Sequence, residues 1–267
     1  MARKLISIEA LNFRSTPDTS SLANRIDILH LGQSVTEIGP ATKSGWVEIA
    51  VEIDGITKQG VVKAEINELL TLREPVSNSR EALVVEAIKE WLRFEQGQAK
   101  DHIDPYFRFV GEMWKAIGKD HLDGQDENPW SAAAISFMVR NAGKSFQKYN
   151  NFKFSGRHSD YMHDSIKKQK VADINAPFWG FRLFQKKPEI GDIVGKWREE
   201  QSDFDDAEVG RNFSSHCDII VSIHPDFVLT IGGNVKHSVS ISRYAKTPNG
   251  YIDDENENNI ILMVNKV

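Results

Sequence analysis

Ser131 stands where a serine can serve either structure or chemistry. It follows Pro129 and Trp130 and precedes a run of Ala, Ile, Phe, Met and Val that ends at Gly143, which predicts a helix beginning at this serine. The first backbone N–H groups of a helix have no intrahelical partner. A serine there can cap them with its side chain, or it can be a nucleophile whose oxyanion those amides stabilise. Both interpretations stay open at this point.

His216 is the predicted general base for such a serine. The segment SHCDIIVSI around it predicts a strand, and side chains alternate along a strand, so His216 and Asp218 share one face while Cys217 points to the other. A serine hydroxyl is weakly acidic and requires a base within hydrogen-bond reach. The alternative for His216 is a strand-end histidine bonded to a loop carbonyl. Cys217 is interpreted as a small buried hydrophobic residue.

Asp218 and Asn234 are the two candidates to hold the second ring nitrogen of His216. Such an acceptor fixes the tautomer and orientation of a histidine base. Asp218 is favoured by its charge. Asn234 follows Gly232 and Gly233, and paired glycines in a strand mark a bulge or a close backbone approach, as beside a cleft. Because a plain hairpin turn also accounts for the glycine pair, both candidates remain.

A second polar cluster lies in SGRHSDYMHD, at the start of a helix that is predicted to begin at Ser159. His158 is a candidate to bind substrate or to supply a second base. A metal-dependent hydrolase built from His158, His163 and His216 is a further alternative, although the sequence has no compact motif such as H-E-x-x-H. No cofactor and no metal is expected.

The composition is typical of a soluble globular protein. The chain has 267 residues, 40% of them hydrophobic and 27% charged, and a formal net charge of -5, which argues against a nucleic-acid groove. No apolar run approaches a membrane span of about 18 residues. The N-terminus alternates polar and apolar residues and does not predict a signal peptide. The single cysteine excludes a disulfide framework and a multi-cysteine zinc site.

Two domains are predicted, residues 1–70 and 80–267, joined by a linker at 71–79. The first has short alternating strands separated by Gly, Pro, Asp and Ser, which is typical of a small β-barrel. The second has helical patterns first and strands from residue 190 onward, which indicates an α+β domain with an antiparallel sheet. The acidic segment 198–215 between two of these strands is long and contains no predicted element.

Four blocks of the second domain resemble the NlpC-type and CHAP papain-like amidases. They are PWSAAAISFMVRNAG, PEIGDIV, SSHCDIIVSI and LTIGGNVKHSVSI, and they are similar to the blocks P-W-C-A-A-F-[VI], G-D-[IL]-V, [GS]-H-[VC]-[GD]-[IV] and G-G-N in the same order. The most similar branch is bacterial and carries P-W-S-A-A in place of P-W-C-A-A. The resemblance implies a papain-like α+β fold with Ser131 as nucleophile, His216 as base and Asn234 as its polar partner.

The same branch has an S-x-x-H-x-x-Y pattern, which His158 and Tyr161 match. Together with Trp130 of the first block, they are the residues predicted to contact the substrate. In the first domain, LNFRSTPD, LHLGQSV, SGWVEIAV and QGVVKAEI resemble the bacterial SH3 pattern. Val61 stands where that pattern usually has an aromatic residue, which weakens one wall of the usual ligand groove.

The resemblance implies hydrolysis of amide or peptide bonds in bacterial cell-wall peptidoglycan, with its peptide stems as partner. The alternatives are a catalytically inactive wall- or protein-binding module that retains the cleft, and the metal-dependent hydrolase described above. Without a signal peptide, a wall enzyme needs a dedicated secretion route to the periplasm, as interbacterial effector toxins use, or phage-type release. An immunity or other inhibitor protein, or a secretion partner, is expected with such a route.

Overall fold

The computed structural model describes residues 2–8, 10–30, 33–66, 69–254 and 258–267. Contacts within the chain divide it into two compact units, Met1–Ser77 and Asn78–Val267. The division falls inside the segment 71–79 that the sequence predicts as a linker. In the described ranges, no helix is long and apolar enough to cross a membrane.

The N-terminal unit is built from antiparallel strands. β5 (Trp46–Ile53) and β6 (Ile56–Lys63) form a hairpin across Asp54 and Gly55, whose φ angles of 52° and 74° are those of the Asp-Gly turns that hairpins favour. The seven-stranded sheet has the order β3-β2-β6-β5-β4-β1-β9. Its other strands are β1 (Ala2–Ile6), β2 (Leu11–Arg14), β3 (Arg25–Leu29), β4 (Ser34–Pro40) and β9 (Leu72–Arg73), and a separate pair is formed by β7 (Glu65–Ile66) and β8 (Leu69–Leu70).

This sheet is open in the part of the unit that the structure describes. β3 and β9 are its edges, and the strand order contains no pair that joins them. The predicted SH3-like barrel is therefore not confirmed. Local alternation predicts that strands exist and which residues are buried, such as Phe13, Ile49 and Val62, but sheet closure depends on pairing between distant strands.

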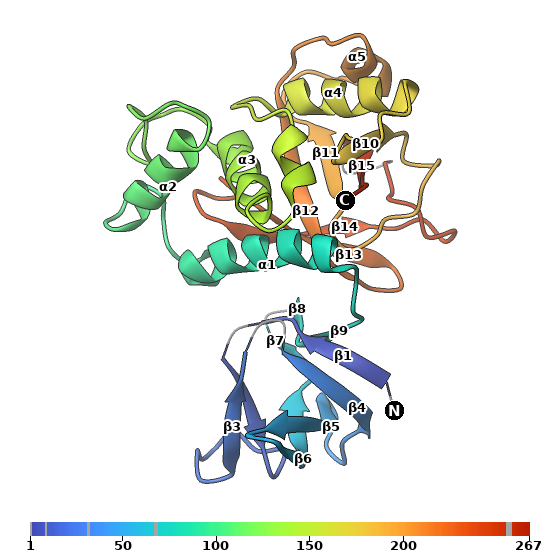
Figure 1. Ribbon diagram of the computed structural model, residues 1–267. Coiled ribbons are helices and arrows are strands. Elements are labelled where there is room, and N and C mark those ends of the chain that lie inside the picture. The colour runs from blue at the N-terminus through green and yellow to red at the C-terminus, as the bar shows by residue number, and fades with distance from the viewer. Residues whose placement is uncertain (1, 9, 31–32, 67–68, 255–257) are drawn as a thin grey trace. The chain divides into compact units, whose positions relative to one another are not determined.

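The C-terminal unit combines helices with a six-stranded sheet (Figure 1). The sheet order is β10-β15-β11-β12-β13-β14, and every neighbouring pair is antiparallel, which confirms the α+β class. The helices are α1 (Asn78–Arg93), α2 (Tyr106–Lys115), α3 (Ser131–Ala142), α4 (His158–Lys170) and α5 (Phe204–Glu208), and the short 3-10 helices are Glu95–Gly97 and Gln147–Asn151. The strands are β10 (Phe178–Phe181), β11 (Ile193–Trp197), β12 (Ser215–Ile223), β13 (Phe227–Gly232), β14 (Ser240–Ala245) and β15 (Asn259–Asn265).

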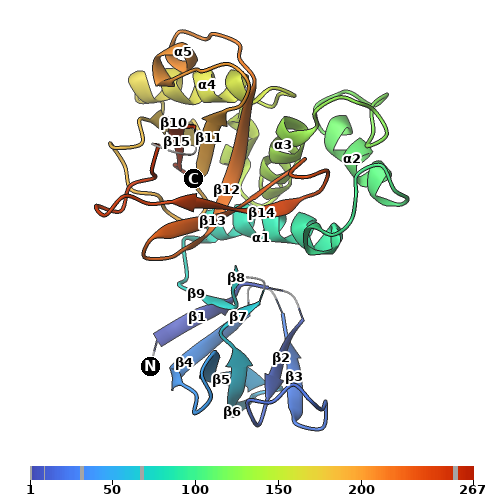
Figure 2. The same ribbon diagram turned by 180° about the vertical axis from the view of Figure 1, so that it is seen from behind.

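Helices α1 and α3 pack against β12 and β13, and the view from behind shows β13 and β14 in front of α1 (Figure 2). Three alanines follow Ser131 in the first turn of α3, and the helix approaches the sheet closely. A Cβ added at Gly233 would lie 2.3 Å from the Ala134 Cβ and 2.8 Å from the Trp130 ring. The glycine therefore permits the first turn of α3 to lie against the end of β13, as the paired glycines indicate.

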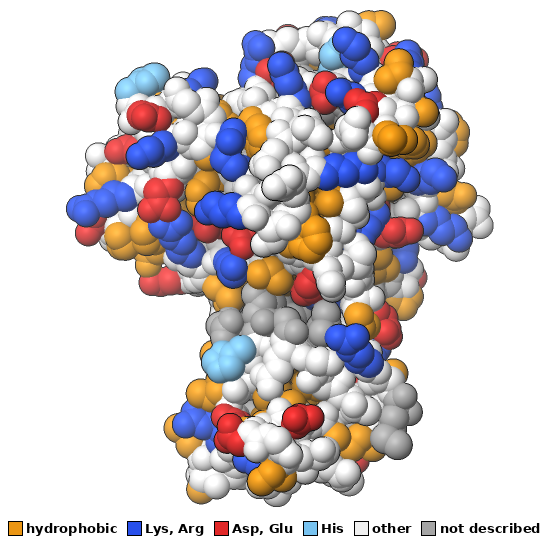
Figure 3. Space-filling view, in the orientation of Figure 1, with side chains coloured by type: hydrophobic (Ala, Val, Ile, Leu, Met, Phe, Trp, Pro, Cys, Tyr) orange, Lys and Arg blue, Asp and Glu red, His pale blue; other side chains and the backbone are white. Residues whose placement is uncertain are grey.

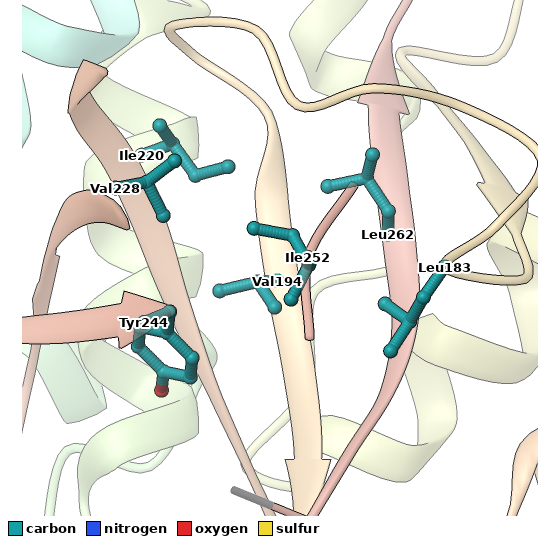
Figure 4. Packing of buried hydrophobic residues seen from close by; sticks show 7 residues of the cluster. All are labelled: Leu183, Val194, Ile220, Val228, Tyr244, Ile252 and Leu262. Carbon is teal, nitrogen blue, oxygen red and sulfur yellow. The ribbon is translucent and has the colours of Figure 1, made fainter. Parts of the chain in front are cut away.

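A hydrophobic cluster joins the central strands of this sheet (Figure 4). Its members are fully or almost fully buried aliphatic side chains and one tyrosine: Leu183, Val194, Ile220, Val228, Tyr244, Ile252 and Leu262. Burial of such side chains stabilises a fold by about 1.5–3 kcal/mol each. Because Tyr244 also reaches Asp218 on β12, the cluster fixes the strand that carries His216.

The acidic segment between β11 and β12 is not devoid of structure. It forms α5, where the Asp203 side chain accepts from the Asp206 N–H and Asp206 reaches back in a capping box. A pair of oppositely charged side chains, Lys170 and Glu208, lies 3.1 Å apart between α4 and α5. Charged side chains of both signs are interspersed over the face of the C-terminal unit seen in Figure 3.

Candidate active site

Ser131 is the first residue of α3 and does not cap it. The capping position is Trp130, which makes no side-chain cap hydrogen bond. Instead, Ser131 Oγ lies 2.7 Å from His158 Nε2, at hydrogen-bond distance. The Trp130 indole N–H donates to Asp101 Oδ2 at 2.8 Å, and its ring stacks on Phe94 with centroids 5.8 Å apart. Buried packing of Trp130 thus holds the start of the helix in place.

The amides of residues 131–133 have no partner within α3. The first helical hydrogen bond of α3 runs from the Ala134 N–H to the Trp130 carbonyl at 3.0 Å. Unpaired amides at a helix start, together with the positive end of the helix dipole, stabilise a negative charge nearby. Ser131 therefore lies beside groups that can hold an oxyanion.

His158 is the residue that faces the serine. It is the first residue of α4, it is 4% exposed, and its Nδ1 contacts the hydroxyl of Tyr161 one turn later. Burial lowers the pKa of His158 well below its ordinary value of 6.5, and the charge of Arg198 acts in the same direction. At neutral pH this imidazole is uncharged and has one donor and one acceptor nitrogen. In the tautomer that suits a base, Nδ1–H donates to Tyr161 and Nε2 accepts from the Ser131 hydroxyl.

Tyr161 keeps its hydroxyl proton at neutral pH. Burial, and secondarily the nearby Cys217 thiol, raises the pKa of this tyrosine well above its ordinary value of 10.0. Burial also raises the pKa of Cys217, which is a free, fully buried cysteine, as its place on the far face of β12 predicts. The group that contacts Nδ1 of His158 is therefore a neutral hydroxyl and not a carboxylate.

His216 lies beside this pair but contacts other groups. Its ring centroid is 5.3 Å from that of His158, and its Nε2 is 2.8 Å from Asp218 Oδ1, without the alignment of a directed hydrogen bond. The Tyr244 hydroxyl donates to the second oxygen of Asp218. Burial alone raises the pKa of Asp218, but His216, Tyr244 and Lys196 outweigh it and lower the value to about 2.

Arg198 occupies the other nitrogen of His216. Its Nη2 lies 3.0 Å from His216 Nδ1. A guanidinium only donates, so Nδ1 must accept, and the ring hydrogen is on Nε2, facing Asp218. Both nitrogens of His216 are thereby engaged with charged groups, while Ser131 is hydrogen bonded to His158.

Ser131 and His158 open onto a cavity of about 440 Å³. A second cavity of about 280 Å³ lies on the His216 side. Arg198 lines both of them. The first cavity is lined mainly by polar side chains from the starts of α3 and α4 and from the segment between β11 and β12: Ser131, Arg157, His158, Arg198, Glu199, Glu200, Asn212, Ser214 and Ser215.

In the described part of the chain, the remaining predicted site residues make no side-chain hydrogen bond to Ser131. Asn234 follows β13 with a φ of 55°, half-buried, and it makes no side-chain contact with His216 among the described residues. Trp130 is buried in structural contacts. His163 Nδ1 lies 3.1 Å from the Ala207 carbonyl. In the described ranges, no group of three or more His, Cys, Asp or Glu side chains is arranged to hold a metal ion.

Arg198 is the site residue that sequence reasoning missed. It directly follows β11 and begins the acidic segment, where it reads as one charge among several. The signal that singles it out is positional. It lies in the strand pair β11–β12, where Lys196 is the register partner of His216, so Arg198 continues the strand just beyond that histidine.

The residues of this site all lie in the part of the chain that matches one family model. A family model described as "Uncharacterized protein conserved in bacteria (DUF2272)" matches residues 109–262. No curated protein matches the chain significantly. A solved structure with similarity is NlpC2 from Trichomonas vaginalis, at 11% identity and a TM-score of 0.29, over 94% of this chain and 70% of that chain. A TM-score this low leaves the description of the fold to the strand order and helix packing given above.

Proposed function

This chain belongs to the bacterial family described as DUF2272, and on that premise we propose that it is a serine-dependent amide hydrolase with a papain-like fold that acts on the peptide stems of bacterial cell-wall peptidoglycan. The observation that carries the chemistry is the 2.7 Å contact between Ser131 Oγ and His158 Nε2 at the opening of the 440 Å³ cavity. The substrate class is supported by the resemblance of the four sequence blocks to the NlpC-type and CHAP amidases.

In the first step, Ser131 Oγ attacks the carbonyl carbon of the amide and His158 Nε2 takes its proton. The carbonyl π electrons move to oxygen, and the unpaired amides of residues 131–133 stabilise the resulting oxyanion. The imidazolium formed on His158 donates through Nδ1 to Tyr161. A hydroxyl stabilises that charge less than a carboxylate does, which favours rapid return of the proton.

In the second step, the oxyanion collapses and the C–N bond breaks. His158 gives its proton to the leaving nitrogen, and an ester on Ser131 remains. Water then attacks the ester while His158 takes one of its protons. The C–Oγ bond breaks as His158 returns that proton to Ser131 Oγ, which releases a carboxylic acid and restores the serine. In this scheme His158 takes the role that the sequence assigns to His216.

His216 and Asp218 act on the reaction through charge in this proposal. The side chain of His216 lies between the buried carboxylate of Asp218 and His158. Its Nε2 is 2.8 Å from Asp218 Oδ1, and its ring centroid is 5.3 Å from that of His158. The negative charge of Asp218 favours the imidazolium that His158 becomes, which is the direction in which Asp218 shifts the pKa of His158. His216 is thus proposed as a positioning residue.

The N-terminal unit is proposed to be an SH3-like module that holds the enzyme on the wall. The support is the resemblance of residues 1–70 to the bacterial SH3 pattern and the antiparallel architecture of the unit. The open sheet order calls for a direct test. A protein consisting of residues 78–267 is expected to bind insoluble peptidoglycan less than the full chain does in a sedimentation assay.

A binding module without turnover is the second candidate, favoured by one observation. Both nitrogens of His216 are engaged, and the base that faces Ser131 has a pKa well below its ordinary value, which weakens it as a proton acceptor. Such a module predicts that peptide stems bind and remain intact, and that Ser131→Ala leaves their affinity unchanged.

The proposed activity is tested by incubating the full chain with purified peptidoglycan and identifying released fragments by mass spectrometry. Wild type is expected to release peptide fragments, and Ser131→Ala is expected to lose about 10⁴-fold or more in rate. Ser131→Cys is the informative companion, because a thiol at a helix start is more acidic than a hydroxyl and is expected to retain activity. Release that persists in Ser131→Ala, or no release by wild type, would overturn the proposal.

A further inference from the structure

The guanidinium of Arg198 lines the cavity that Ser131 opens onto, and in the described part of the chain its charge is not paired with a carboxylate. Its Nη2 donates to Nδ1 of His216 at 3.0 Å, and among the described residues no carboxylate lies within ion-pair distance of it. The side chain as a whole is exposed and lines both cavities. By contrast, Arg157, which lines the first cavity too, is paired with Asp160 at 3.3 Å.

An imidazole nitrogen is a poor partner for a guanidinium compared with a carboxylate. Carboxylates accept two parallel hydrogen bonds from the guanidinium fork, and both partners carry charge, which makes these bonds shorter and stronger than neutral ones. A ligand that brings a carboxylate into this cavity therefore competes with His216 for Arg198. The carboxylates of the protein that line this cavity do not pair with Arg198, because Glu200 contacts Arg211 at 3.4 Å and Glu199 is exposed to solvent.

Resting on the proposed function, we propose that Arg198 is the receptor for a carboxylate of the substrate, and that binding of this carboxylate releases Nδ1 of His216. The substrate class is then a peptide with a free carboxylate near the scissile amide, in the cavity that Ser131 opens onto. Arg198 is a specificity residue in this scheme. The exchange of partners also couples substrate binding to His216, which gains a free nitrogen beside His158.

The test uses the full chain with Ser131→Ala, so that binding is measured without turnover. The probes are acetyl-Ala-Ala as free acid and as C-terminal amide, and acetyl-Ala-Glu-amide beside acetyl-Ala-Gln-amide. The first pair tests a terminal carboxylate and the second a side-chain carboxylate. In calorimetric titrations, the acid of at least one pair is expected to bind about tenfold more tightly than its neutral counterpart.

Matched variants assign the preference to one residue. Arg198→Gln in the Ser131→Ala background is expected to abolish it, Arg198→Lys to retain part of it, and Arg157→Gln to leave it unchanged. Thermal unfolding checks that each variant is folded. Equal affinities for acid and neutral probes, no binding of the acids up to millimolar concentration, or a preference that survives Arg198→Gln would each overturn the assignment.

The release of His216 has its own readout. In ¹⁵N-histidine-labelled protein, the Nδ1 resonance of His216, identified by its loss in His216→Gln, is expected to shift with the acid probe and not with the neutral one. A carboxylate preference without that shift would overturn the exchange of partners. A preference with the shift in a protein that releases no fragments from peptidoglycan would reject the proposed hydrolysis while the carboxylate receptor stands.

Discussion

His158 and His216 are neighbours with ring centroids 5.3 Å apart, but different groups hold them. His158 contacts two neutral hydroxyls, those of Ser131 and Tyr161, whereas His216 faces the carboxylate of Asp218 and the guanidinium of Arg198. In serine hydrolase triads, one histidine contacts both the nucleophile and the carboxylate. Here those contacts are divided between two side chains. Because His158 contacts the nucleophile and His216 contacts the charged groups, substitution of each histidine measures one of the two contributions separately.

Of the two histidines, the one that contacts the nucleophile is expected to have the larger effect when it is removed. His158→Ala should lower kcat on peptidoglycan by about 10³-fold, because Ser131 loses its proton acceptor. His216→Ala should lower kcat by about tenfold, since His216 acts through the surroundings of His158. Initial rates of fragment release measure both, with circular dichroism as the control for folding. A greater loss in His216→Ala would return the role of base to His216, as the sequence predicts.

The local parts of this site could be predicted from the sequence. Alternation in SHCDIIVSI predicts β12 and places His216 and Asp218 on one face, where the structure has them 2.8 Å apart. The apolar run after Ser131 predicts α3 and its start. Each of these inferences depends on neighbours within one element, and periodicity carries that information.

The pairing across elements could not be predicted in this way. Ser131 contacts His158 because the start of α4 lies beside the start of α3. No hydrophobic periodicity in the intervening residues 143–157 predicts that placement. The predicted start of this helix at Ser159 was one residue late, because α4 begins at His158 and the Ser159 hydroxyl donates to Asn212 in the acidic segment. Arg198 was missed because a charge after a strand has no signature of its own until its partner is known.

A substitution of Gly232 tests how tightly the side chains of Asp218 and His216 are packed. A Cβ at this position would lie 1.6 Å from Asp218 Oδ1 and 3.2 Å from His216 Nε2, and both side chains are buried. Gly232→Ala is therefore expected to lower the free energy of unfolding by about 3 kcal/mol. The control is Gly39→Ala, where a Cβ meets nothing within 4 Å and a change below about 1 kcal/mol is expected. Denaturant unfolding measures both, and equal small effects would show that the Asp218 site is pliable.

Asp218 should make stability depend on pH in a defined window. Its pKa is lowered from 3.8 to about 2 in the folded protein, so its ionised form is favoured by folding. The stabilisation is fully present above the unfolded value near 3.8 and is lost as pH falls through the folded value near 2, which amounts to about 2 kcal/mol. Denaturant unfolding of wild type and Asp218→Asn between pH 5 and pH 2 should show the difference between them shrink by this amount. A difference that stays constant across the window would contradict an ionised Asp218.

The smallest effect is expected from removing the Tyr161 hydroxyl, and it tests whether this hydroxyl orients His158 or only packs beside it. Tyr161→Phe removes the acceptor of the His158 Nδ1–H, so the other tautomer, which presents an N–H to Ser131, becomes accessible. kcat is expected to fall by about tenfold with KM unchanged. Loss of this acceptor also disfavours the imidazolium, so the acidic limb of the pH–rate profile should move to lower pH.

Tyr149→Phe is the matched control for this change. Its buried hydroxyl donates to the Ser79 carbonyl at 2.9 Å and accepts from Asn265 at 2.7 Å, in the same unit as His158 but with no contact to that histidine. Both tyrosine variants are expected to lose about 1 kcal/mol of unfolding free energy. Only Tyr161→Phe should change kcat and the pH profile. If the two variants differ in neither, Tyr161 fills space beside His158, and the serine's histidine is oriented by its position on α4 alone.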